Sequence, residues 1–485
     1  MTKKKVMFEI DKEKNFSEWY SEILQRTEIS DIRYGVKGFV VIRPWGARII
    51  EKMYKLYELE LQKKGHEPSF FPMVIPEENF KKEAGHVKGF SPDVFWLELK
   101  QGEDRVALRP TGETEFYEMY NKWIRSYRDL PYKLYQRGSV FRYETKATRP
   151  LIRGREFWWI EAHDCFKSKK GAEEQVQEDI KMTEKVMHQT FGVPFLPLKR
   201  PEWDKFPGAV YTIGSDSLMP DGKIIQQPST HFLGQHFSKA FDIKFIDENE
   251  KENYVWQTCY GPAISRILAS VISVHGDNSG LVLPYVISPY QVVIVPMYSE
   301  KKNDEIKAFV DKLGQELFQE GVDVKIDDSE KRPGEKFFYW EMKGIPFRIE
   351  VGEKELTSNE LTVFIRDLKE KRKIKLDGFV EEIKNLGIEY DLRLKQKADE
   401  SFYSKIIECE NKLDIKRVLN EGKIAKFNFC SLDTEGESCA AYIEKELLAD
   451  VRGCLGNKIE KPFNDKKCPF CGKLAKFVVY SGRSY

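Results

Sequence analysis

The sequence has no long hydrophobic run. The hydrocarbon core of a bilayer requires about 20 consecutive apolar residues to span it, and no run in these 485 residues approaches that length. The first residues, Met-Thr-Lys-Lys-Lys, also lack the apolar stretch of a secretory signal. We therefore expect a cytoplasmic protein that has no membrane partner.

The chain also lacks an excess of charge of either sign, an internal repeat and a low-complexity segment. Its 79 basic and 78 acidic residues leave a net charge of +1, which excludes a protein coated in positive charge. RNA binding is not excluded, because a local basic surface making about ten phosphate contacts gives salt-dependent affinity. Charge alone therefore does not separate an RNA-binding enzyme from other classes.

Cysteine is scarce in most of the chain and concentrated at its end. Cys165 and Cys259 lie far apart, whereas the other six follow residue 408. Without a secretion signal, such clustering favours a metal site over disulfides. The six are Cys409, Cys430, Cys439, Cys454, Cys468 and Cys471.

The length and the pattern of apolar residues predict a multidomain protein of α/β and α+β type. In residues 1–288, a helix over 47–64 precedes several short strand-like runs, which predicts a mainly antiparallel sheet with helices on one side. The runs are 70–75, 94–99, 106–109, 133–144 and 155–166. Residues 289–390 alternate strands and helices, which predicts an α/β domain. Residues 391–485 carry six of the eight cysteines. The charged stretch 379–405, which overlaps the start of this region, predicts a solvated helical linker.

The most informative stretch is 133–166, a predicted hairpin. Alternation along a strand puts Arg142 and Glu144 on one face of the first strand. The same alternation puts Phe157, Trp159, Glu161 and His163 on one face of the second strand. Burying such groups unpaired would cost several kcal/mol, and a merely solvated face would leave the two aromatics unexplained. The pattern therefore favours a ligand-binding surface.

The string Phe141-Arg142-Tyr-Glu144, followed by Arg153 and Phe157, resembles motif 2 of the class II aminoacyl-tRNA synthetases. The resemblance implies an antiparallel-sheet catalytic core. It also implies that Arg142 holds the ATP α-phosphate and the amino-acid carboxylate, Glu144 meets the adenine amino group, Arg153 meets the γ-phosphate and Phe157 stacks on adenine. A fixed guanidinium suits adenylate formation because it can bridge two anions. Mg²⁺ is implied together with ATP.

Two further strings support the resemblance. Gly261-x-x-x-Ser265-Arg266 is similar to motif 3, which implies that Ser265 and Arg266 lie at the nucleotide and that Arg266 is catalytic together with Arg142. Pro262 and Ala263 stand where another glycine is usual. The helix and the strand bearing Pro72 resemble motif 1, which implies a homodimer, although ordinary core packing explains that pattern equally well.

Three other strings bear on which amino acid such an enzyme would use. Arg109-Pro-Thr111-Gly-Glu113, Trp158-Trp-Ile-Glu161-Ala-His163 and Gln226-Gln-Pro-Ser229-Thr-His231 resemble the archaeal and eukaryotic type of prolyl-tRNA synthetase. The resemblance implies that Gln226 and Ser229 face the nucleotide. It implies a proline pocket formed by Thr111, Glu113, Arg142, Trp159, Glu161, His163 and His231. A secondary ammonium has two N–H donors, which suits the acceptors at Thr111 and Glu113, and a flat aromatic wall suits a small ring.

The spacing of the motifs bears on the type of enzyme. Too few residues separate Arg142 from Arg266 for an editing insertion, so we expect a separate protein to clear mischarged alanine. The expected partners are L-proline, ATP and tRNA(Pro). Two alternatives stay open: another class IIa synthetase, threonyl or glycyl, and an inactive tRNA-binding paralogue. The paralogue should have lost Arg142, Glu144 or Arg266, and all three are present.

The second and third domains carry their own candidate sites. Residues 333–352 resemble an anticodon-binding domain, in which Arg348 and Glu350 alternate onto one strand face and can read guanine, unless they form only a surface ion pair. Cys468-Pro-Phe-Cys471 is typical of a zinc knuckle in a small α+β domain. Cys430 and Cys439 are the expected second pair for a structural Zn²⁺, with Cys454 as a rival for one place and free thiols as the alternative. The carboxylate of Tyr485 is expected to fold toward the catalytic domain.

Overall fold

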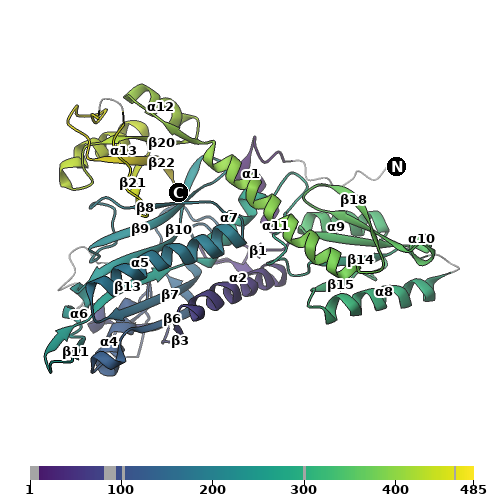
Figure 1. Cartoon of the computed structure of the whole chain (residues 1–485), viewed down its shortest axis with the longest axis horizontal. Coiled ribbons are helices and arrows are strands. Elements are labelled where there is room, and N and C mark those ends of the chain that lie inside the picture. Colours follow the sequence, from purple (N-terminus) through teal and green to yellow (C-terminus); the bar gives the residue numbers. More distant parts are fainter. Residues whose placement is uncertain (1–9, 81–93, 101–103, 299–301, 464–465) are drawn as a thin grey trace.

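The computed structural model describes residues 10–80, 94–100, 104–298, 302–463 and 466–485. Figure 1 shows an elongated molecule, with a large sheet and the C-terminal elements at one end and an α/β unit at the other. Helix α11 (Phe379–Tyr403) runs between the two ends. No helix in the described ranges combines the length and apolar character that crossing a membrane requires.

The centre of the molecule is a sheet of eleven strands that is antiparallel in most of its pairings. Its order is β19-β20-β22-β21-β8-β9-β10-β13-β7-β6-β3. The strands from the first part of the chain are β3 (Glu67–Pro68), β6 (Tyr132–Phe141), β7 (Glu156–Phe166), β8 (Leu196–Lys199), β9 (Tyr211–Leu218), β10 (Lys223–Gly234) and β13 (Trp256–Gly261). Helices α2 (Pro44–Lys63), α5 (Lys169–Thr183) and α7 (Ile264–His275) lie along it in Figure 1. The expected antiparallel core with helices is confirmed.

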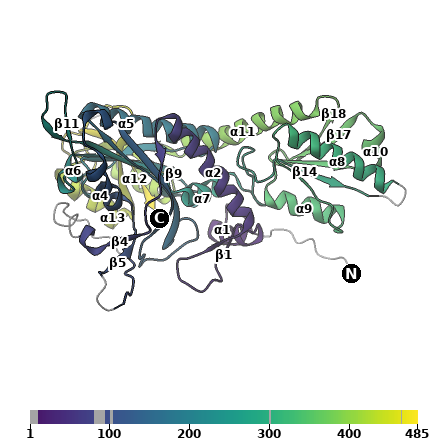
Figure 2. The same ribbon diagram turned by 90° about the horizontal axis from the view of Figure 1, so that it is seen from below.

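The predicted elements of the catalytic region are largely present. Helix α2 begins with Pro44 at its first turn and buries the residues that recur at helical spacing. In the run 70–75 a strand forms only as β4 (Val74–Pro76), which pairs with β5 (Val106–Leu108). The run 94–99 is not a strand, since Trp96 makes only an isolated bridge to Ala107. Figure 2 shows β4 and β5 and, separately from them, β1 (Ser30–Asp31) on the lower side of the molecule.

The remaining elements of this region are short or peripheral. They are α1 (Phe16–Arg26), β2 (Val41–Ile42), α4 (Glu113–Trp123), η1 (Tyr127–Asp129), the π-helical η2 (Glu184–Thr190), α6 (His236–Ala240), β11 (Lys244–Ile246) and β12 (Glu252–Tyr254). Among them α4 matters most for function, because its first turn carries Glu113 into the centre of the catalytic region.

The predicted α/β unit forms a five-stranded sheet of order β15-β14-β16-β17-β18. Its elements are β14 (Val292–Pro296), α8 (Asn303–Gln319), β15 (Val324–Ile326), α9 (Pro333–Lys343), β16 (Phe347–Val351), α10 (Glu353–Thr357), β17 (Glu360–Ile365) and β18 (Glu370–Lys375). The expectation of a solvated linker over 379–405 is wrong for one side of α11. That side is buried at Phe379, Ile383, Leu386, Tyr390, Leu394 and Phe402, because the apolar residues among its charges form a continuous stripe.

The C-terminal elements extend the catalytic sheet. They are β19 (Ile406–Glu408), α12 (Lys412–Asn420), β20 (Ile424–Phe429), η3 (Thr434–Gly436), α13 (Glu437–Leu447), β21 (Asp450–Leu455) and β22 (Phe477–Ser484). Strand β21 pairs with β8, and β22 pairs with β10. A side chain at Gly453 would place its Cβ 1.9 Å from the carbonyl oxygen of Lys199, so only glycine permits this approach. The boundaries at 288/289 and 390/391 stay a prediction.

Candidate active site

A cavity of about 240 Å³ opens where β7, β10 and β13 meet the start of α4 and of α7. Residues from distant parts of the sequence line it, and ten of them belong to the sites expected from the sequence. These are Thr111, Glu113, Arg142, Trp159, Glu161, His163, Gln226, Ser229, His231 and Arg266. The hairpin register explains part of this convergence, since β7 places Trp159, Glu161 and His163 two residues apart.

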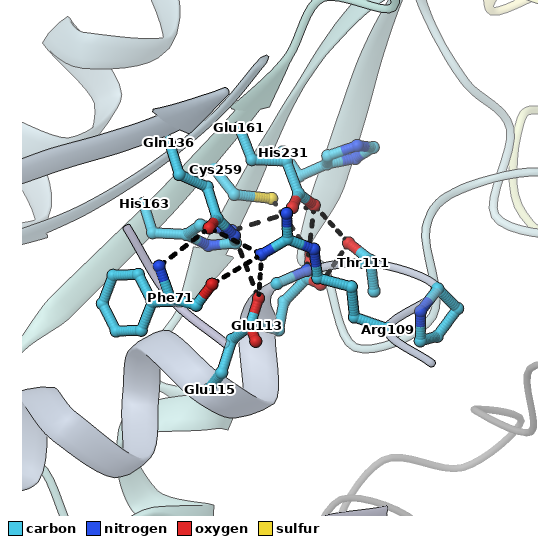
Figure 3. A network of polar contacts seen from close by, with 12 residues as sticks. Phe71, Arg109, Thr111, Glu113, Glu115, Gln136, Glu161, His163, His231 and Cys259 are labelled. Atoms are coloured by element: carbon cyan, nitrogen blue, oxygen red, sulfur yellow. Dashed lines mark hydrogen bonds and ion pairs between the residues drawn. The ribbon is translucent and has the colours of Figure 1, made fainter. Parts of the chain in front are cut away.

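Buried carboxyl groups form one end of the cavity. The Oγ1 atom of Thr111 lies 2.5 Å from Glu113 Oε2 and also contacts Glu161 Oε1, as Figure 3 shows. Because a hydroxyl has one proton, Thr111 donates to one carboxyl group, and the other must be protonated to donate in return. Burial and the charge of Glu161 raise the pKa of Glu113 to about 7. Below about pH 7 the pair therefore shares a proton when the cavity holds no cation.

Two neutral histidines flank these carboxyl groups. His163 contacts the hydroxyl of Tyr117 through Nδ1 at 3.0 Å, and burial together with His231 lowers its pKa to about 3. The two ring nitrogens of His231 contact Thr212 Oγ1 at 2.8 Å and Ser229 Oγ at 3.1 Å. Burial and two arginines, Arg200 and Arg142, lower the pKa of His231 to about 3. Both rings therefore offer neutral polar edges rather than positive charge.

Several polar atoms around the cavity have no hydrogen-bond partner within the described part of the chain. They include Trp159 Nε1, Glu161 Oε2 and His163 Nε2. Buried polar atoms are normally paired, so three unpaired ones around one cavity indicate a polar ligand.

The other end of the cavity is cationic. The Arg142 guanidinium lies over the rings of Phe157 and Trp159, at 5.2 and 5.6 Å from their centroids, and its Nε donates to the carbonyl of Pro110. Arg266 stands in the first turn of α7 and donates to the carbonyls of Ile152 and Gln226.

The electrostatics at this end point to an anion. Burial, together with the positive charges of Arg142 and Arg153, lowers the pKa of Arg266 to about 10, and only Glu144 opposes them. Three guanidinium groups stand close together at this end, and an anion bound between Arg142 and Arg266 would reduce their mutual repulsion. A polyphosphate has the charge and the oxygens for this role.

The remaining residues expected at the nucleotide lie beside the cavity. Arg153, Phe157 and Ser265 line a neighbouring hollow of about 390 Å³. Glu144 lines neither space, and its Oε2 lies 3.9 Å from Arg153 Nε. The predicted strand 133–144 ends at Phe141, so Arg142 and Glu144 stand in the loop beyond β6 rather than on one strand face as expected. Their backbone is held there by the hydrogen bond from Arg142 N to Arg155 O.

Behind the carboxyl end, a buried network around Arg109 supports the pocket (Figure 3). Its guanidinium donates to Gln136 Oε1 at 2.8 Å and to the carbonyl of Ser139 at 3.0 Å, and lies 3.4 Å from Glu115. Sequence reasoning used Arg109 only as part of a motif. It missed Arg200, Phe206, Thr212 and Cys259, which also line the cavity. For Cys259 a signal existed, since it stands two residues before Gly261 on the strand leading into motif 3.

The cysteines of the C-terminal region converge on one point. The sulfur atoms of Cys430, Cys439, Cys468 and Cys471 all lie within 4.8 Å of one another, whereas Cys454 is not part of this group. Cys468 N and Gly472 N complete a tight turn through bonds to Lys473 O and Cys468 O. A second close group of metal-binding side chains is Glu113, His163 and Cys259, inside the cavity. The long spacing between Cys430 and Cys439 is accommodated by η3.

Arg348 and Glu350 of β16 form a buried ion pair rather than a surface pair, with Nη2 and Oε1 2.9 Å apart. The guanidinium is sandwiched between the rings of Phe337 and Phe364, at 4.2 and 4.3 Å from their centroids. Lys371 reaches Glu350 from the solvent side at 2.6 Å. The side chains therefore form a charged and aromatic cluster.

The last residue lies at the catalytic region. The backbone oxygen of Tyr485 accepts a hydrogen bond from Arg153, and its hydroxyl donates to the carboxylate of Asp221 at 2.7–2.8 Å. The expected approach of Tyr485 to the catalytic domain is thus present in the structure.

Comparison with known proteins gives matches over most of the chain. Residues 95–275 match the tRNA synthetase class II core domain (G, H, P, S and T), residues 291–386 an anticodon binding domain, and residues 413–485 the prolyl-tRNA synthetase C-terminal domain. The proline–tRNA ligase of Thermofilum pendens is 46% identical over 482 residues, or 98% of both chains.

Solved structures give the same result. Giardia lamblia prolyl-tRNA synthetase in complex with prolyl-adenylate matches with a TM-score of 0.91 and 37% identity, over 98% of this chain and 99% of that one. The Cryptosporidium parvum enzyme complexed with L-proline and AMP matches with a TM-score of 0.90 and 32% identity, over 99% and 97% of the two chains.

The antiparallel sheet, the arginines of the hairpin and of α7, and the matching core domain define a class II aminoacyl-tRNA synthetase. The C-terminal domain match and the relatives that align over nearly the whole chain narrow this class to the prolyl-tRNA synthetases. The chain belongs to the prolyl-tRNA synthetase family, in the type found in archaea and eukaryotes.

Proposed function

We propose that this chain activates L-proline with ATP to form prolyl-adenylate and pyrophosphate, and then transfers the prolyl group to the 3′ end of tRNA(Pro). The observation that carries the proposal is the polarity of the cavity. One end holds the carboxyl groups of Glu113 and Glu161, and the other holds Arg142 and Arg266. Proline has an ammonium and a carboxylate, so it fits this cavity in one orientation.

The carboxyl end binds the secondary ammonium of proline. One N–H group of the ammonium donates to Glu113 and the other to Thr111 Oγ1, whose own hydroxyl proton is donated to Glu161, and the shared proton of the carboxyl pair passes to solvent. Trp159 provides a flat wall for the methylene groups of the pyrrolidine ring, which carry no polar atom. This arrangement selects an amino acid with a small, apolar side chain and an amino group that has two N–H donors.

The cationic end promotes the chemical step. A carboxylate oxygen of proline attacks the α-phosphorus of ATP, its new P–O bond forms, and the bond to the bridging oxygen of pyrophosphate breaks. No general base is needed, because the nucleophile is already an anion. Arg142 neutralises the carboxylate and the α-phosphate as they approach, while Arg266 and Arg153 bind the leaving pyrophosphate. ATP enters as its Mg²⁺ complex, which lowers the charge that these arginines must balance.

The neighbouring residues position the nucleoside. Phe157 lies against Arg142 and forms a face on which adenine can stack. Glu144 supplies an acceptor for the adenine amino group, and Gln226, Ser229 and Ser265 supply polar groups toward the ribose and phosphates. Ser265 Oγ is buried without a hydrogen-bond partner in the described chain, which supports a ligand contact there.

In the α/β domain, Arg348 and Glu350 recognise the tRNA anticodon. The exposed partner of their ion pair, Lys371, can move to a phosphate and free Glu350 as an acceptor for a base. Phe337 and Phe364 hold the guanidinium plane of Arg348, which can donate to guanine O6 and N7.

The four-cysteine cluster binds a structural Zn²⁺. Four sulfur ligands without an open position are typical of structural zinc, and Cys468 and Cys471 have the knuckle spacing. The ion would fix the turn at Gly472 against the loop between Cys430 and Cys439, and it supplies no chemistry to the distant cavity.

Assembly and location follow from the same proposal. Exposed apolar side chains near β1 and β4, Ile32, Tyr34, Phe70 and Met73 among them, suit a homodimer interface formed by motif 1. An enzyme that charges tRNA for protein synthesis would work in the cytoplasm. Light scattering during gel filtration tests the dimer, which requires twice the 56.8 kDa chain mass.

Charging of a tRNA(Pro) transcript with labelled proline tests the proposed function. We expect charging that requires ATP and produces one AMP for each prolyl group transferred. Charging with threonine or glycine instead would favour another class IIa enzyme, and binding of tRNA without any charging would favour an inactive paralogue.

A further inference from the structure

Residues 201–207, here called the strap, form most of the connection between β8 and β9 and lie between the C-terminal elements and the cavity. Figure 1 shows β8 and β9 beside β21 of the C-terminal region. Four strap residues line the cavity: Asp204, Lys205, Phe206 and Pro207. The strap therefore faces the proposed proline site on one side and another domain on the other.

The outer side of the strap is anchored in the C-terminal domain. The indole of Trp203 packs on a hydrophobic core whose other members all come from residues 407–479. Next to it, the N–H of Glu202 donates to the carbonyl of Leu432 at 2.9 Å. Leu432 stands in the loop between Cys430 and Cys439 and is itself buried in that core.

The middle of the strap is held by charge. Asp204 lies 3.8 Å from Arg200 and 3.6 Å from Arg452, a residue of β21. Both arginines are buried and share the carboxylate of Asp216, at 2.6 and 2.8 Å. With one buried carboxylate for two guanidinium groups, a positive charge is left, and Asp204 balances it.

The inner side of the strap forms the wall of the cavity. The ring of Phe206 lies 4.7 Å from that of His231, centroid to centroid. The N–H of Phe206 donates to Thr212 Oγ1 at 2.9 Å, and that oxygen also contacts His231 Nδ1 at 2.8 Å. The position of the strap backbone therefore fixes both the ring and the hydrogen bond that orient His231.

We propose that Trp203 is a positioning residue for proline, through which the C-terminal domain determines the shape of the amino-acid pocket. Packing of the indole on the C-terminal core lowers the conformational entropy of the seven-residue strap, which has no regular secondary structure. Phe206 then stands against His231 before proline arrives. The inference rests on the proposed use of this cavity for proline.

The test is the variant Trp203→Ala in ATP–pyrophosphate exchange, with the KM for proline and the KM for ATP measured separately. A wall that is displaced by about 1 Å can cost up to about a hundredfold in rate. We expect the KM for proline to rise about tenfold or more, with the KM for ATP changed by less than about twofold. Trp203→Phe should restore most of the proline affinity, because a smaller aromatic ring still fills the core.

Ile407→Ala is the matched control. Ile407 packs on the same C-terminal core from the edge strand β19 and does not belong to the strap. It should lower the melting temperature without changing the KM for proline. If Trp203→Ala does not fold, Trp203→Leu replaces it with the same expected rise.

Three outcomes would overturn the proposal: an unchanged KM for proline in folded Trp203→Ala or Trp203→Leu, equal rises in both KM values, or the same rise in Ile407→Ala. Failure of the proposed function is distinguishable from these, because the wild-type chain would then show no proline-dependent exchange at all.

Discussion

Trp159 of β7 lies directly against Gly261, the last residue of β13. A methyl group built on Gly261 would stand 2.6 Å from Cζ2 of the indole, closer than carbon atoms approach in proteins. The hydrogen bond from Ile160 N to Pro262 O holds the two segments at this distance. Gly261 of motif 3 thus fixes the position of Trp159, the aromatic wall of the proposed proline pocket. Motif 3 and the string 158–163 therefore form one structural unit.

Gly261→Ala should therefore damage proline binding more than ATP binding. The added methyl group forces Trp159 toward the cavity, so we expect the KM for proline to rise by about tenfold or more. The KM for ATP should change by a smaller factor. Kinetics of ATP–pyrophosphate exchange measure both, and Gly334→Ala, whose new Cβ would meet nothing within 4 Å, is the control. Equal KM values for proline in Gly261→Ala and in the wild type would contradict the account.

The affinity for proline should increase with pH. Burial and Glu161 raise the pKa of Glu113 to about 7, so the carboxyl pair keeps its shared proton below that pH and loses it above. The secondary ammonium of proline binds the ionised form. The KM for proline should therefore fall as the pH rises from about 6 to about 8 and then become constant, with a slope of at most about one power of ten per pH unit.

Glu113→Gln provides the control for this titration. The amide cannot ionise, so the variant should bind proline weakly at all these pH values and lose most of the pH dependence. A KM for proline in the wild type that rises with pH, or the same slope in the variant, would show that another group titrates.

Arg142→Ala should abolish adenylate formation without removing tRNA binding. The guanidinium neutralises two approaching anions, and a loss of about 3 to 5 kcal/mol corresponds to at least a hundredfold lower exchange rate. A filter-binding measurement of the Kd for tRNA(Pro) should give the wild-type value, because Arg348 stands in the sheet of the α/β unit, which lies at the opposite end of the molecule from the catalytic sheet (Figure 1). Simultaneous loss of tRNA binding would indicate misfolding and would remove the support for a local role.

The zinc assignment predicts a difference between two cysteines of the same region. Cys471→Ser should reduce the zinc content measured by elemental analysis and lower the melting temperature, because Cys471 belongs to the four-sulfur cluster. Cys454→Ser should retain one zinc per chain, since Cys454 stands outside the cluster. If both variants retain zinc, or if the wild type contains none, the cluster is not a zinc site.

Much of the site could be predicted because its residues stand in short strings with fixed spacing. Glu161 and His163 share a strand face, and Arg266 follows a glycine at the start of a helix, so local rules place each of them. The structure also brings the two predicted cysteine pairs together, although η3 lengthens the spacing between Cys430 and Cys439.

The parts that sequence reasoning missed depend on contacts between distant segments. Nothing near Trp203 indicates that its indole packs in a core built 200 residues later. Helix α11 has many charges, which predicted a solvated linker. One side of it is buried because the helix packs both on the catalytic region and on the α/β unit. For Arg348 and Glu350 the sequence predicted a strand face that reads anticodon bases, with a surface ion pair as the alternative; the rings of Phe337 and Phe364, which enclose Arg348, come from other elements and could not be foreseen.

The most direct test of the central claim is ATP–pyrophosphate exchange by the wild-type chain with each of the twenty amino acids in turn. A cavity with paired carboxyl groups at one end, arginines at the other and Trp159 between them predicts that proline supports exchange and that threonine and glycine do not. Exchange supported by threonine or glycine in place of proline, or no exchange with any amino acid, would contradict it.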